Sequence, residues 1–514
     1  MSSNPEKVSW LDRPLFPALP FFTYEVIIFS IILFLAGVSR LYDLGARVMS
    51  HDESLHVYYS WLFSEGFGYQ HTPTTHGPLQ FHLLSLIFML FGDNDFTARL
   101  PHAIASILTV LMVWKWRRYL GQVGALITAG LLLLSPFMLY YGRYARNEAF
   151  VALLGLLTLY SILRYLETGK NRHLLLLTAV TSLHFATKET AFIYTAQAML
   201  FLAYCIIKHV AQSPWQKAGF RNVFVLVLAL GILLLSLAFG VNIFSNIQSS
   251  VKDNFATSPQ IPGSMIQAAG STQNISSTAT LVILACIAFL VAIVLLVIGY
   301  GWKNLQHERS FDMLIILGTF VLPLLTAFPV KALGWNPLDY SFTWPGWNLQ
   351  ALWSQGPFRT AVILLLLAIV SIVIGLLWDW KRWLKNAVLF WGIFIFLYSS
   401  IFSNWSGLAT GTVGSLGYWL VQQGVNRGSQ PWYYYLLVQI PLYEYLPALG
   451  LILAFFFGIR HRAPASANLI DSSDDRLMNN NPIIAPLFPL LAWWALSSLV
   501  AYSIAGEKMP WLTV

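Results

Sequence analysis

Residues 278–301 read TATLVILACIAFLVAIVLLVIGYG, an apolar stretch without a single charged side chain. A helix needs about 20 apolar residues to cross the hydrocarbon core of a bilayer, and this stretch is long enough. Backbone N–H and C=O groups find no water in hydrocarbon, so the stretch must satisfy them internally as a helix. The sequence therefore predicts a membrane-spanning helix here.

Similar stretches recur along the 514 residues, which are 57% hydrophobic and only 10% charged. This composition excludes a soluble globular domain and indicates an all-helical (all-α) integral membrane protein. Residues 79–91 are too short to cross the bilayer and are predicted to form a helix at the membrane surface. We predict about thirteen transmembrane helices, near residues 24–41, 98–116, 123–141, 149–164, 173–187, 191–208, 222–246, 278–301, 312–330, 360–378, 387–403, 442–459 and 483–505.

The positions of the 30 Lys and Arg residues predict the orientation of these helices. With a cytoplasmic N-terminus, most of these residues fall in inner loops, including the basic clusters 115–118 and 381–385. The net charge of +8 is thus a signal of topology, and its spread over loop ends excludes a nucleic-acid partner. We predict a multi-pass protein of the cell membrane with long segments on the extracytoplasmic side.

The chain is predicted to be one polytopic domain, residues 1–514, with surface helices in the first outer loop, residues 42–97. Residues 463–482 are rich in Asn, Ser and Asp and are predicted to form a flexible cytoplasmic loop. The first twenty residues lack the short apolar core of a signal peptide, so we expect no removable one. The two cysteines lie in apolar stretches and indicate no disulfide framework.

Charged residues gather at the outer ends of the predicted spans, beginning with Ser50-His51-Asp52-Glu53 in the first outer loop. A carboxylate at the bilayer boundary must be hydrated, paired or bound to a polar ligand. Asp52 is a candidate general base for an attacking hydroxyl group, or else it only favours the helix dipole. Glu53 has capping-box spacing from Ser50, so it is either a second catalytic carboxylate or a helix cap.

Two further outer turns carry basic and acidic side chains together. Arg143, Arg146 and Glu148 lie in a short turn, where the arginines either bind a phosphate through their planar forks or anchor the helix ends. Lys188 and Glu189 end a later span on the same side and are both candidate substrate-binding residues. Lys188 either adds its charge to the same site or pairs with Glu189.

Four histidines share the first outer loop with these carboxylates, namely His51, His56, His71 and His76. Asp52 and His56 are four residues apart, a spacing that places two side chains on one helix face and is open to a divalent metal ion. Histidines in a polar loop more often form hydrogen bonds or contact a substrate. We therefore expect no resident metal or other cofactor, and we take His56 and His76 as candidate substrate-binding residues.

These segments together resemble the GT-C superfamily of membrane glycosyltransferases, which includes the protein O-mannosyltransferases and the lipid A aminoarabinose transferase. The matching pieces are Asp52-Glu53, the helix after His76-Gly77-Pro78, the segment Ala98-Arg99-Leu100-Pro101, and Arg146-Asn147-Glu148. The chain is most similar to a prokaryotic group described as flippase-activity-associated or mannosyltransferase-like. Residues 186–190, 430–435 and 506–511 support that placement.

The resemblance implies a GT-C fold and an inverting transfer of a sugar from a polyprenyl-phosphate donor at the extracytoplasmic face. The acceptor implied is an unspecified protein, lipid or glycan. Asp52 would be the general base and Glu148 the second acidic residue of the site. One or more of Arg143, Arg146 and Lys188 would hold the donor phosphate, with Lys508 beside them.

Two other functions fit the same sequence. A transporter or flippase of lipid-linked sugars would share the charged outer cavity, but it usually carries ionisable residues near the bilayer midplane, whereas the charges here lie at span ends. A non-catalytic subunit of a glycosylation assembly would keep the scaffold without turnover, because a fold does not prove an activity.

Overall fold

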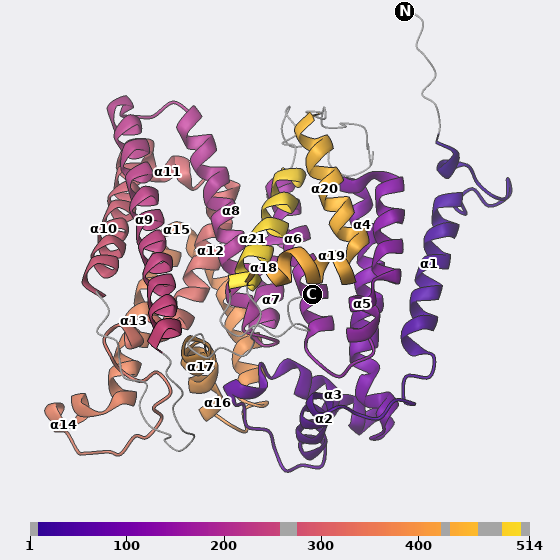
Figure 1. Ribbon diagram of the computed structural model, residues 1–514, viewed down its shortest axis with the longest axis horizontal. Helices are drawn as coiled ribbons and strands as arrows, with labels where there is room; N and C mark the ends of the chain where they lie inside the picture. Colours follow the sequence, from indigo (N-terminus) through magenta and orange to yellow (C-terminus); the bar gives the residue numbers. More distant parts are fainter. Residues whose placement is uncertain (1–8, 257–274, 423–431, 461–485, 505–514) are drawn as a thin grey trace, which may run out of the picture. The chain divides into compact units, whose positions relative to one another are not determined.

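The computed structural model describes residues 9–256, 275–422, 432–460 and 486–504, and it confirms the all-helical class for these ranges (Figure 1). Residues 463–482, predicted to be a flexible loop, lie outside the described residues. The α-helices are α1 (Tyr24–Leu41), α2 (His51–Ser64), α3 (Leu79–Phe91), α4 (Asp95–Leu134), α5 (Pro136–Tyr141), α6 (Glu148–Thr168), α7 (Asn171–Phe185), α8 (Thr190–Gln212), α9 (Ala218–Ala256), α10 (Ile275–Leu296), α11 (Trp302–Leu305), α12 (Arg309–Val321), α13 (Ala327–Ala332), α14 (Leu349–Ser354), α15 (Gly356–Tyr398), α16 (Ser406–Ala409), α17 (Ser415–Gln422), α18 (Trp432–Tyr434), α19 (Ile440–Tyr443), α20 (Tyr445–Arg460) and α21 (Leu487–Ile504).

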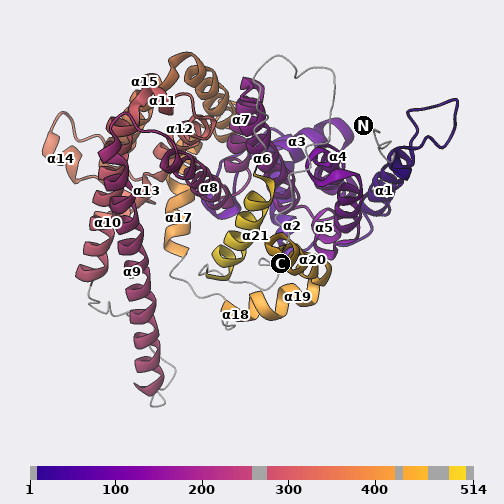
Figure 2. The ribbon, with the colours of Figure 1, turned by 90° about the horizontal axis from the view of Figure 1, so that it is seen from above.

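The chain folds into two compact units, a larger one of residues 1–201 and 313–514 and a smaller one of residues 202–312. In the smaller unit α9 and α10 lie side by side, as Figure 1 and Figure 2 both show. Their outer faces carry exposed aliphatic side chains such as Leu226 and Leu290. Such faces are typical of helices surrounded by lipid.

Seven helices in the described residues are long and apolar enough to cross a membrane, which confirms a multi-pass membrane protein. They are α1, α4, α6, α8, residues 219–241 of α9, residues 280–305 and α15. The number is below the predicted thirteen for two reasons. Helices α4 and α15 each contain two predicted spans, and four other predicted spans coincide with the shorter helices α7, α12, α20 and α21.

Helix α4 is two helices joined at Gly121, where φ is 71° and ψ is 175°, a conformation that favours glycine. Arg40 of α1 donates hydrogen bonds to Ser106 Oγ in the first half, at 3.4 Å, and to the carbonyl of Leu132 in the second half, at 2.8 Å. Because one guanidinium reaches both halves, the chain folds back on itself at Gly121. The basic cluster 115–118 therefore lies near the tip of a helical hairpin, as predicted for a loop between two spans.

Helix α15 folds back in the same way at Asp379, where φ is −158° and ψ is 98°. Ser371 Oγ in the first half donates to the carbonyl of Thr319, and Trp383 Nε1 in the second half donates to Thr319 Oγ1 at 3.0 Å. Both halves thus contact one residue of α12. The Asp379 carboxylate caps the second half by accepting two backbone N–H groups of its first turn.

The contacts of helix α1 show at which end of the larger unit two of its loops lie. At its N-terminal end Glu25 contacts Arg117 and Gln122 from the hairpin tip of α4. At its C-terminal end Arg143 donates to a carbonyl of the last turn at 2.8 Å. The helix has 18 residues, so these ends are about 27 Å apart. The basic hairpin tip and the turn that carries Arg143 are therefore at opposite ends, as the predicted topology requires.

The loop between α1 and α4 contains the surface helices α2 and α3. Before α3, the N–H of Gly77 donates to the carbonyl of Thr187 at 3.1 Å. A Cβ atom at Gly77 would lie 2.2 Å from the carbonyl oxygen of Ala186, so only glycine fits this approach. The contact fixes the first outer loop against the turn between α7 and α8.

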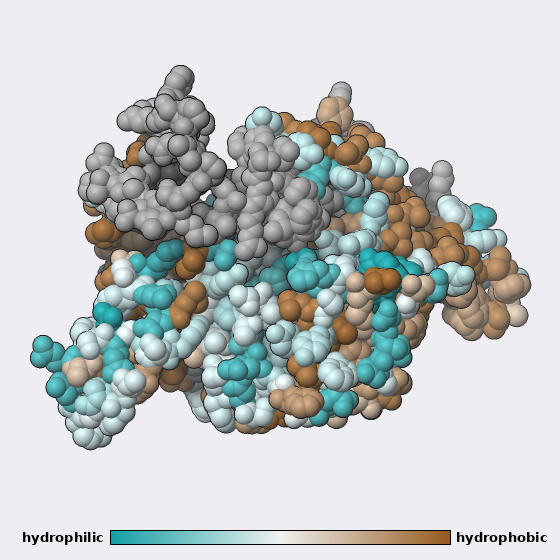
Figure 3. All heavy atoms as spheres, turned by 60° about the horizontal axis from the view of Figure 1, so that its bottom comes forward, coloured by the Kyte–Doolittle hydropathy of each residue, from teal (hydrophilic) through white to brown (hydrophobic). Residues whose placement is uncertain are grey.

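Polar and apolar areas separate on the surface of the larger unit. Exposed apolar side chains follow the outer faces of predicted spans, for example Phe34 of α1 and Leu366 of α15. Figure 3, in which the bottom of Figure 1 comes forward, shows mostly hydrophilic or neutral residues across this face, with hydrophobic residues towards its upper right. This separation is expected where a water-facing surface meets a lipid-facing one.

Candidate active site

Helix α2 begins with the capping box that the sequence predicted. Ser50 Oγ accepts a hydrogen bond from the N–H of Glu53 at 3.4 Å, and Glu53 Oε2 accepts one from the N–H of Ser50 at 3.1 Å. This reciprocal pair fixes the start of α2 and places Asp52 and Glu53 in its first turn. Neighbouring side chains of a helix point about 100° apart, so the two carboxylates enter different surroundings.

The Glu53 carboxylate is completely buried and accepts five hydrogen bonds. The donors are the N–H groups of Ser50 and Ala145, Arg47 Nη2, and Arg99 Nε and Nη2, at 2.8 to 3.1 Å. Burial alone would raise the pKa of Glu53, but Arg99 and the two N–H groups hold it below its ordinary value. Because a carboxylate has about four lone-pair sites, Glu53 has no capacity left for a ligand.

The cap interpretation of Glu53 is thus confirmed, and this geometry gives no support to the catalytic role predicted for it. Arg99, fully buried, completes the network by donating to the carbonyls of Leu44 and Arg47 at 3.0 and 2.9 Å. The network holds the chain after α1, the start of α2 and the first turns of α4 together.

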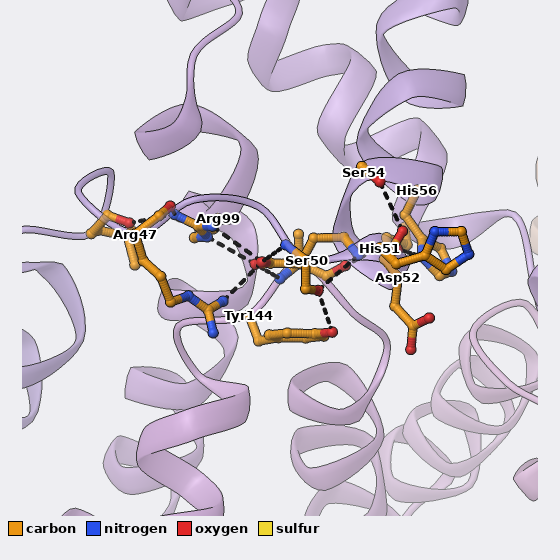
Figure 4. A network of polar contacts seen from close by, with 12 residues as sticks. Arg47, Ser50, His51, Asp52, Ser54, His56, Arg99 and Tyr144 are labelled. Atoms are coloured by element: carbon orange, nitrogen blue, oxygen red, sulfur yellow. Dashed lines mark hydrogen bonds and ion pairs between the residues drawn. The ribbon is translucent and has the colours of Figure 1, made fainter.

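The Asp52 carboxylate points in another direction and meets one guanidinium among the described residues. Its Oδ2 accepts a hydrogen bond from Arg146 Nη1 at 2.7 Å. The Asp52 side chain is 43% exposed, whereas that of Glu53 is 0% exposed. In Figure 4 Asp52 points away from Arg47 and Arg99, which lie on the far side of Ser50. Asp52 therefore keeps capacity to accept a hydrogen bond from a ligand.

Arg146 connects Asp52 to a further charged pair. Its Nε lies 3.5 Å from Glu148 Oε1, which also accepts a 2.7 Å hydrogen bond from Lys188 Nζ. Burial would lower the pKa of Arg146, but Glu148 and Asp52 together raise it, so the guanidinium stays charged. The structure thus brings four predicted site residues into one row of alternating charge. Lys188 pairs with Glu148 instead of Glu189.

A cavity of about 710 Å³ opens beside Asp52 and Arg146, a size typical of small-molecule sites. Its walls come from the start of α2, from α5, from the turn before α6, and from residues 434–444. At the end formed by residues 434–444 lies Glu444, which the sequence analysis did not single out. The aromatic side chains of its lining are Phe137, Tyr140, Tyr141, Tyr144, Tyr434 and Tyr443.

Part of this wall is a stack of tyrosines held by polar contacts. Tyr140 and Tyr144 are stacked with ring centroids 5.1 Å apart. The Arg47 guanidinium lies over both rings, 5.6 and 5.1 Å from their centroids. Ser50 Oγ and Tyr144 Oη share a hydrogen bond of 2.6 Å. Since Arg47 and Ser50 also bind Glu53, the buried network fixes the wall of the cavity.

Arg143, a predicted phosphate ligand, is placed elsewhere. Its Nη1 donates to the carbonyls of Ser39 and Tyr42 at 2.8 and 2.7 Å, and its Nη2 donates to that of Asp43 at 3.1 Å. These carbonyls belong to the end of α1 and the turn after it, where helical partners are lacking. Arg143 thus caps α1, which supports the anchoring alternative, and it does not line the cavity.

His76 and Glu189 form a separate pair, with Nδ1 and Oε2 2.7 Å apart. His76 has a φ of 65°, which is uncommon for a residue other than glycine. Burial would raise the pKa of Glu189, but His76, the backbone N–H of Glu189 and His71 together hold the pKa below its ordinary value. Neither residue lines the cavity, so their predicted role in substrate binding remains a prediction.

His56 lies on the buried face of α2 and is 4% exposed, with its Nδ1 2.7 Å from the backbone carbonyl of Asp52. Burial lowers the pKa of His56 to about 4, so the ring is neutral near pH 7. The ring therefore meets the backbone of Asp52 and not its carboxylate. Within the described ranges, no group of three or more His, Cys, Asp or Glu side chains is placed to hold a metal ion. Lys508 lies outside the described residues.

Arg47, Tyr140, Tyr144 and Glu444 were missed by the sequence analysis. Arg99 was part of the family resemblance but was given no role. The tyrosines and Glu444 carry no motif, because aromatic residues at span ends are common in every membrane protein. Arg47 had one usable signal, its position six residues before a carboxylate at a helix start.

Part of the first half of the chain matches a known protein family. Residues 75–239 match the family of dolichyl-phosphate-mannose-protein mannosyltransferases. This stretch is mannosyltransferase-like. The predicted resemblance is thereby confirmed for these residues, which include Arg99, Arg146, Glu148 and Lys188 of the site. No match is found among curated proteins.

Among solved structures, the chain aligns with a crystal structure of ArnT from Cupriavidus metallidurans bound to undecaprenyl phosphate. The alignment has 14% sequence identity and a TM-score of 0.29, and it covers 94% of this chain and 76% of that chain. A likeness of this size defines neither the fold nor the ligand of the present protein.

Proposed function

We propose that this membrane protein is an inverting glycosyltransferase of the GT-C type. It transfers a sugar from a polyprenyl-phosphate donor to an acceptor hydroxyl at the extracytoplasmic face. The observation that carries the proposal is the Asp52–Arg146 pair, which lies at the wall of a cavity and at the end of the larger unit opposite a basic hairpin tip. The mannosyltransferase-like sequence of residues 75–239 supports it.

Asp52 is the general base of the proposed reaction. As the acceptor hydroxyl attacks the anomeric carbon of the donor sugar, a new C–O bond forms and the bond from that carbon to the phosphate oxygen breaks. The hydroxyl proton passes to Asp52, and the polyprenyl phosphate leaves with the electron pair. A half-exposed carboxylate with free acceptor capacity suits this role, since the base must lie within hydrogen-bond reach of the hydroxyl.

Arg146 stabilises the departing phosphate. Nη1 and Nε of Arg146 face Asp52 and Glu148, and Nη2 has no hydrogen-bond partner in the described part of the protein. Nη2 is therefore placed to donate to a phosphate oxygen of the donor, and such a charge-assisted hydrogen bond is stronger where water is scarce. Glu148, which is itself paired with Lys188, contacts Nε of Arg146. These pairings orient the Arg146 guanidinium towards the donor phosphate.

Reconstitution of the full chain in nanodiscs tests the proposal. A panel of polyprenyl-phosphate sugars is added together with candidate protein, lipid and glycan acceptors, and loss of sugar from the lipid is followed by mass spectrometry. At least one donor is expected to lose its sugar, with empty nanodiscs as the control. A protein that moves these lipids across vesicle membranes without cleaving any of them would be a flippase and would contradict the proposal.

A further inference from the structure

The charges of the cavity disfavour an acceptor that is itself an anion. Its described lining contains two carboxylates, Asp52 and Glu444, and a single guanidinium, Arg146. Arg146 is already paired with Asp52 and is needed for the donor phosphate. A phosphorylated or acidic acceptor would thus add negative charge next to two carboxylates, with no further lysine or arginine among the described lining residues.

Tyrosine faces line the cavity and are held in place before any ligand binds. Tyr140 stacks on Tyr144 and meets Tyr141 edge to face, with 5.1 Å between ring centroids in each case. Tyr141 and Tyr144 are each 6% exposed, so they are not lipid-facing anchors, whereas Tyr140 is 50% exposed and presents its ring. A fixed aromatic face suits the C–H face of a sugar ring, since it offers contact area at little cost in entropy.

Glu444 supplies an oriented acceptor near this aromatic face. Its Oε1 accepts hydrogen bonds from Ser135 Oγ at 2.7 Å and from the N–H of Phe137 at 3.2 Å. These bonds fix the carboxylate at the N-terminus of α5, and no described residue hydrogen-bonds to Oε2. A carboxylate held by one oxygen offers the other to hydroxyl groups, the chief polar groups of a neutral sugar.

We propose that the part of the cavity between Tyr140 and Glu444 binds a sugar of the acceptor, so that the acceptor is a neutral carbohydrate. The inference rests on the proposed glycosyltransferase function. Tyr140 stacks on the ring, Glu444 accepts its hydroxyl protons, and the next hydroxyl along the acceptor reaches Asp52. The alternative acceptor is a peptide that contains serine or threonine, and the test distinguishes the two classes.

The test is direct binding of a neutral disaccharide, mannobiose, to the full chain in nanodiscs, measured by saturation-transfer difference NMR. Tyr140→Ala and Glu444→Gln are each expected to weaken binding about tenfold, as the loss of one stacking or charge-assisted contact does. Tyr58→Ala is the matched control. Tyr58 lies on α2 and is 54% exposed, close to the 50% of Tyr140, but it does not line the cavity.

Binding of mannobiose that depends on Tyr140 and Glu444 but not on Tyr58 supports the inference. Absence of mannobiose binding, equal binding by all variants, or Tyr140-dependent binding of a Ser/Thr hexapeptide would overturn it. Thermal unfolding midpoints of the variants show whether each is folded. Donor cleavage is measured in parallel, so a protein that binds mannobiose but cleaves no donor refutes the proposed function and not the sugar subsite.

Discussion

Asp52 and Glu53 are adjacent carboxylates at the start of one helix, yet they serve two different regions of the molecule. Glu53 faces inward and accepts five hydrogen bonds in a closed network with Arg99, while Asp52 faces a cavity and meets Arg146. The two carboxylates therefore have different roles. The buried network fixes the backbone, and the open pair is left available for chemistry.

The largest effect on stability is expected from Glu53→Gln. This change leaves the fully buried Arg99 without its charged partner, and breaking such a pair costs about 3–5 kcal/mol. The unfolding midpoint in detergent should fall sharply, while transfer per folded molecule stays within about threefold because Glu53 does not reach the cavity. A stable, folded Glu53→Gln protein without transfer activity would contradict the structural role assigned to Glu53.

Arg146→Ala tests the open region. The rate of sugar transfer should fall about 100-fold, the usual effect of removing one donor that stabilises charge in the transition state. Arg146→Lys keeps the charge but loses the planar fork, and it is expected to restore only part of the rate. Transfer rates measured at saturating donor distinguish this loss from weaker donor binding. Wild-type rates in both variants would remove Arg146 from the mechanism.

The buried His56 of α2 makes the stability of the protein depend on pH. The pKa of His56 is lowered to about 4 by burial, whereas an unfolded histidine titrates near 6.5. Between these values the unfolded chain binds a proton that the folded chain does not, so stability falls as the pH is lowered from about 6.5 to about 4. His56→Gln should remove about 2 kcal/mol of this acid sensitivity between pH 7 and pH 4.5. Unfolding midpoints at pH 7 and pH 4.5 give the comparison, and an unchanged difference contradicts the buried neutral histidine.

The smallest effect on transfer is expected from Arg143→Ala. Arg143 caps the end of α1 and does not line the cavity, so the transfer rate should stay within about threefold of the wild type. The unfolding midpoint should fall modestly because three carbonyls lose a donor. If transfer falls as much as in Arg146→Ala while the protein stays folded, Arg143 would be shown to act in the phosphate site.

The sequence predicted the helical class and the multi-pass character because apolar length and charge placement act locally. The turns at Gly121 and Asp379 show this, since each lies between two spans that the hydropathy pattern had already separated. The capping box of Ser50 and Glu53 was also predictable, because it depends on residues three positions apart. These features needed no knowledge of distant contacts.

Contacts between distant segments were beyond prediction from the sequence. Arg143 and Arg146 look alike in sequence, but the fold places one on the carbonyls of α1 and the other on Asp52. The partner of Lys188 is Glu148, forty residues away, and not the adjacent Glu189. Glu444 reaches the cavity from the last quarter of the chain.

The central claim is that Asp52 takes the proton of the acceptor hydroxyl, and the rate of sugar transfer by Asp52→Asn tests it most directly. The variant keeps the shape of the side chain and loses the base, so the rate should fall about 10²- to 10⁴-fold. The unfolding midpoint should stay near that of the wild type, because the side chain is half exposed and outside the Glu53 network. Wild-type transfer by a folded Asp52→Asn protein would contradict the account.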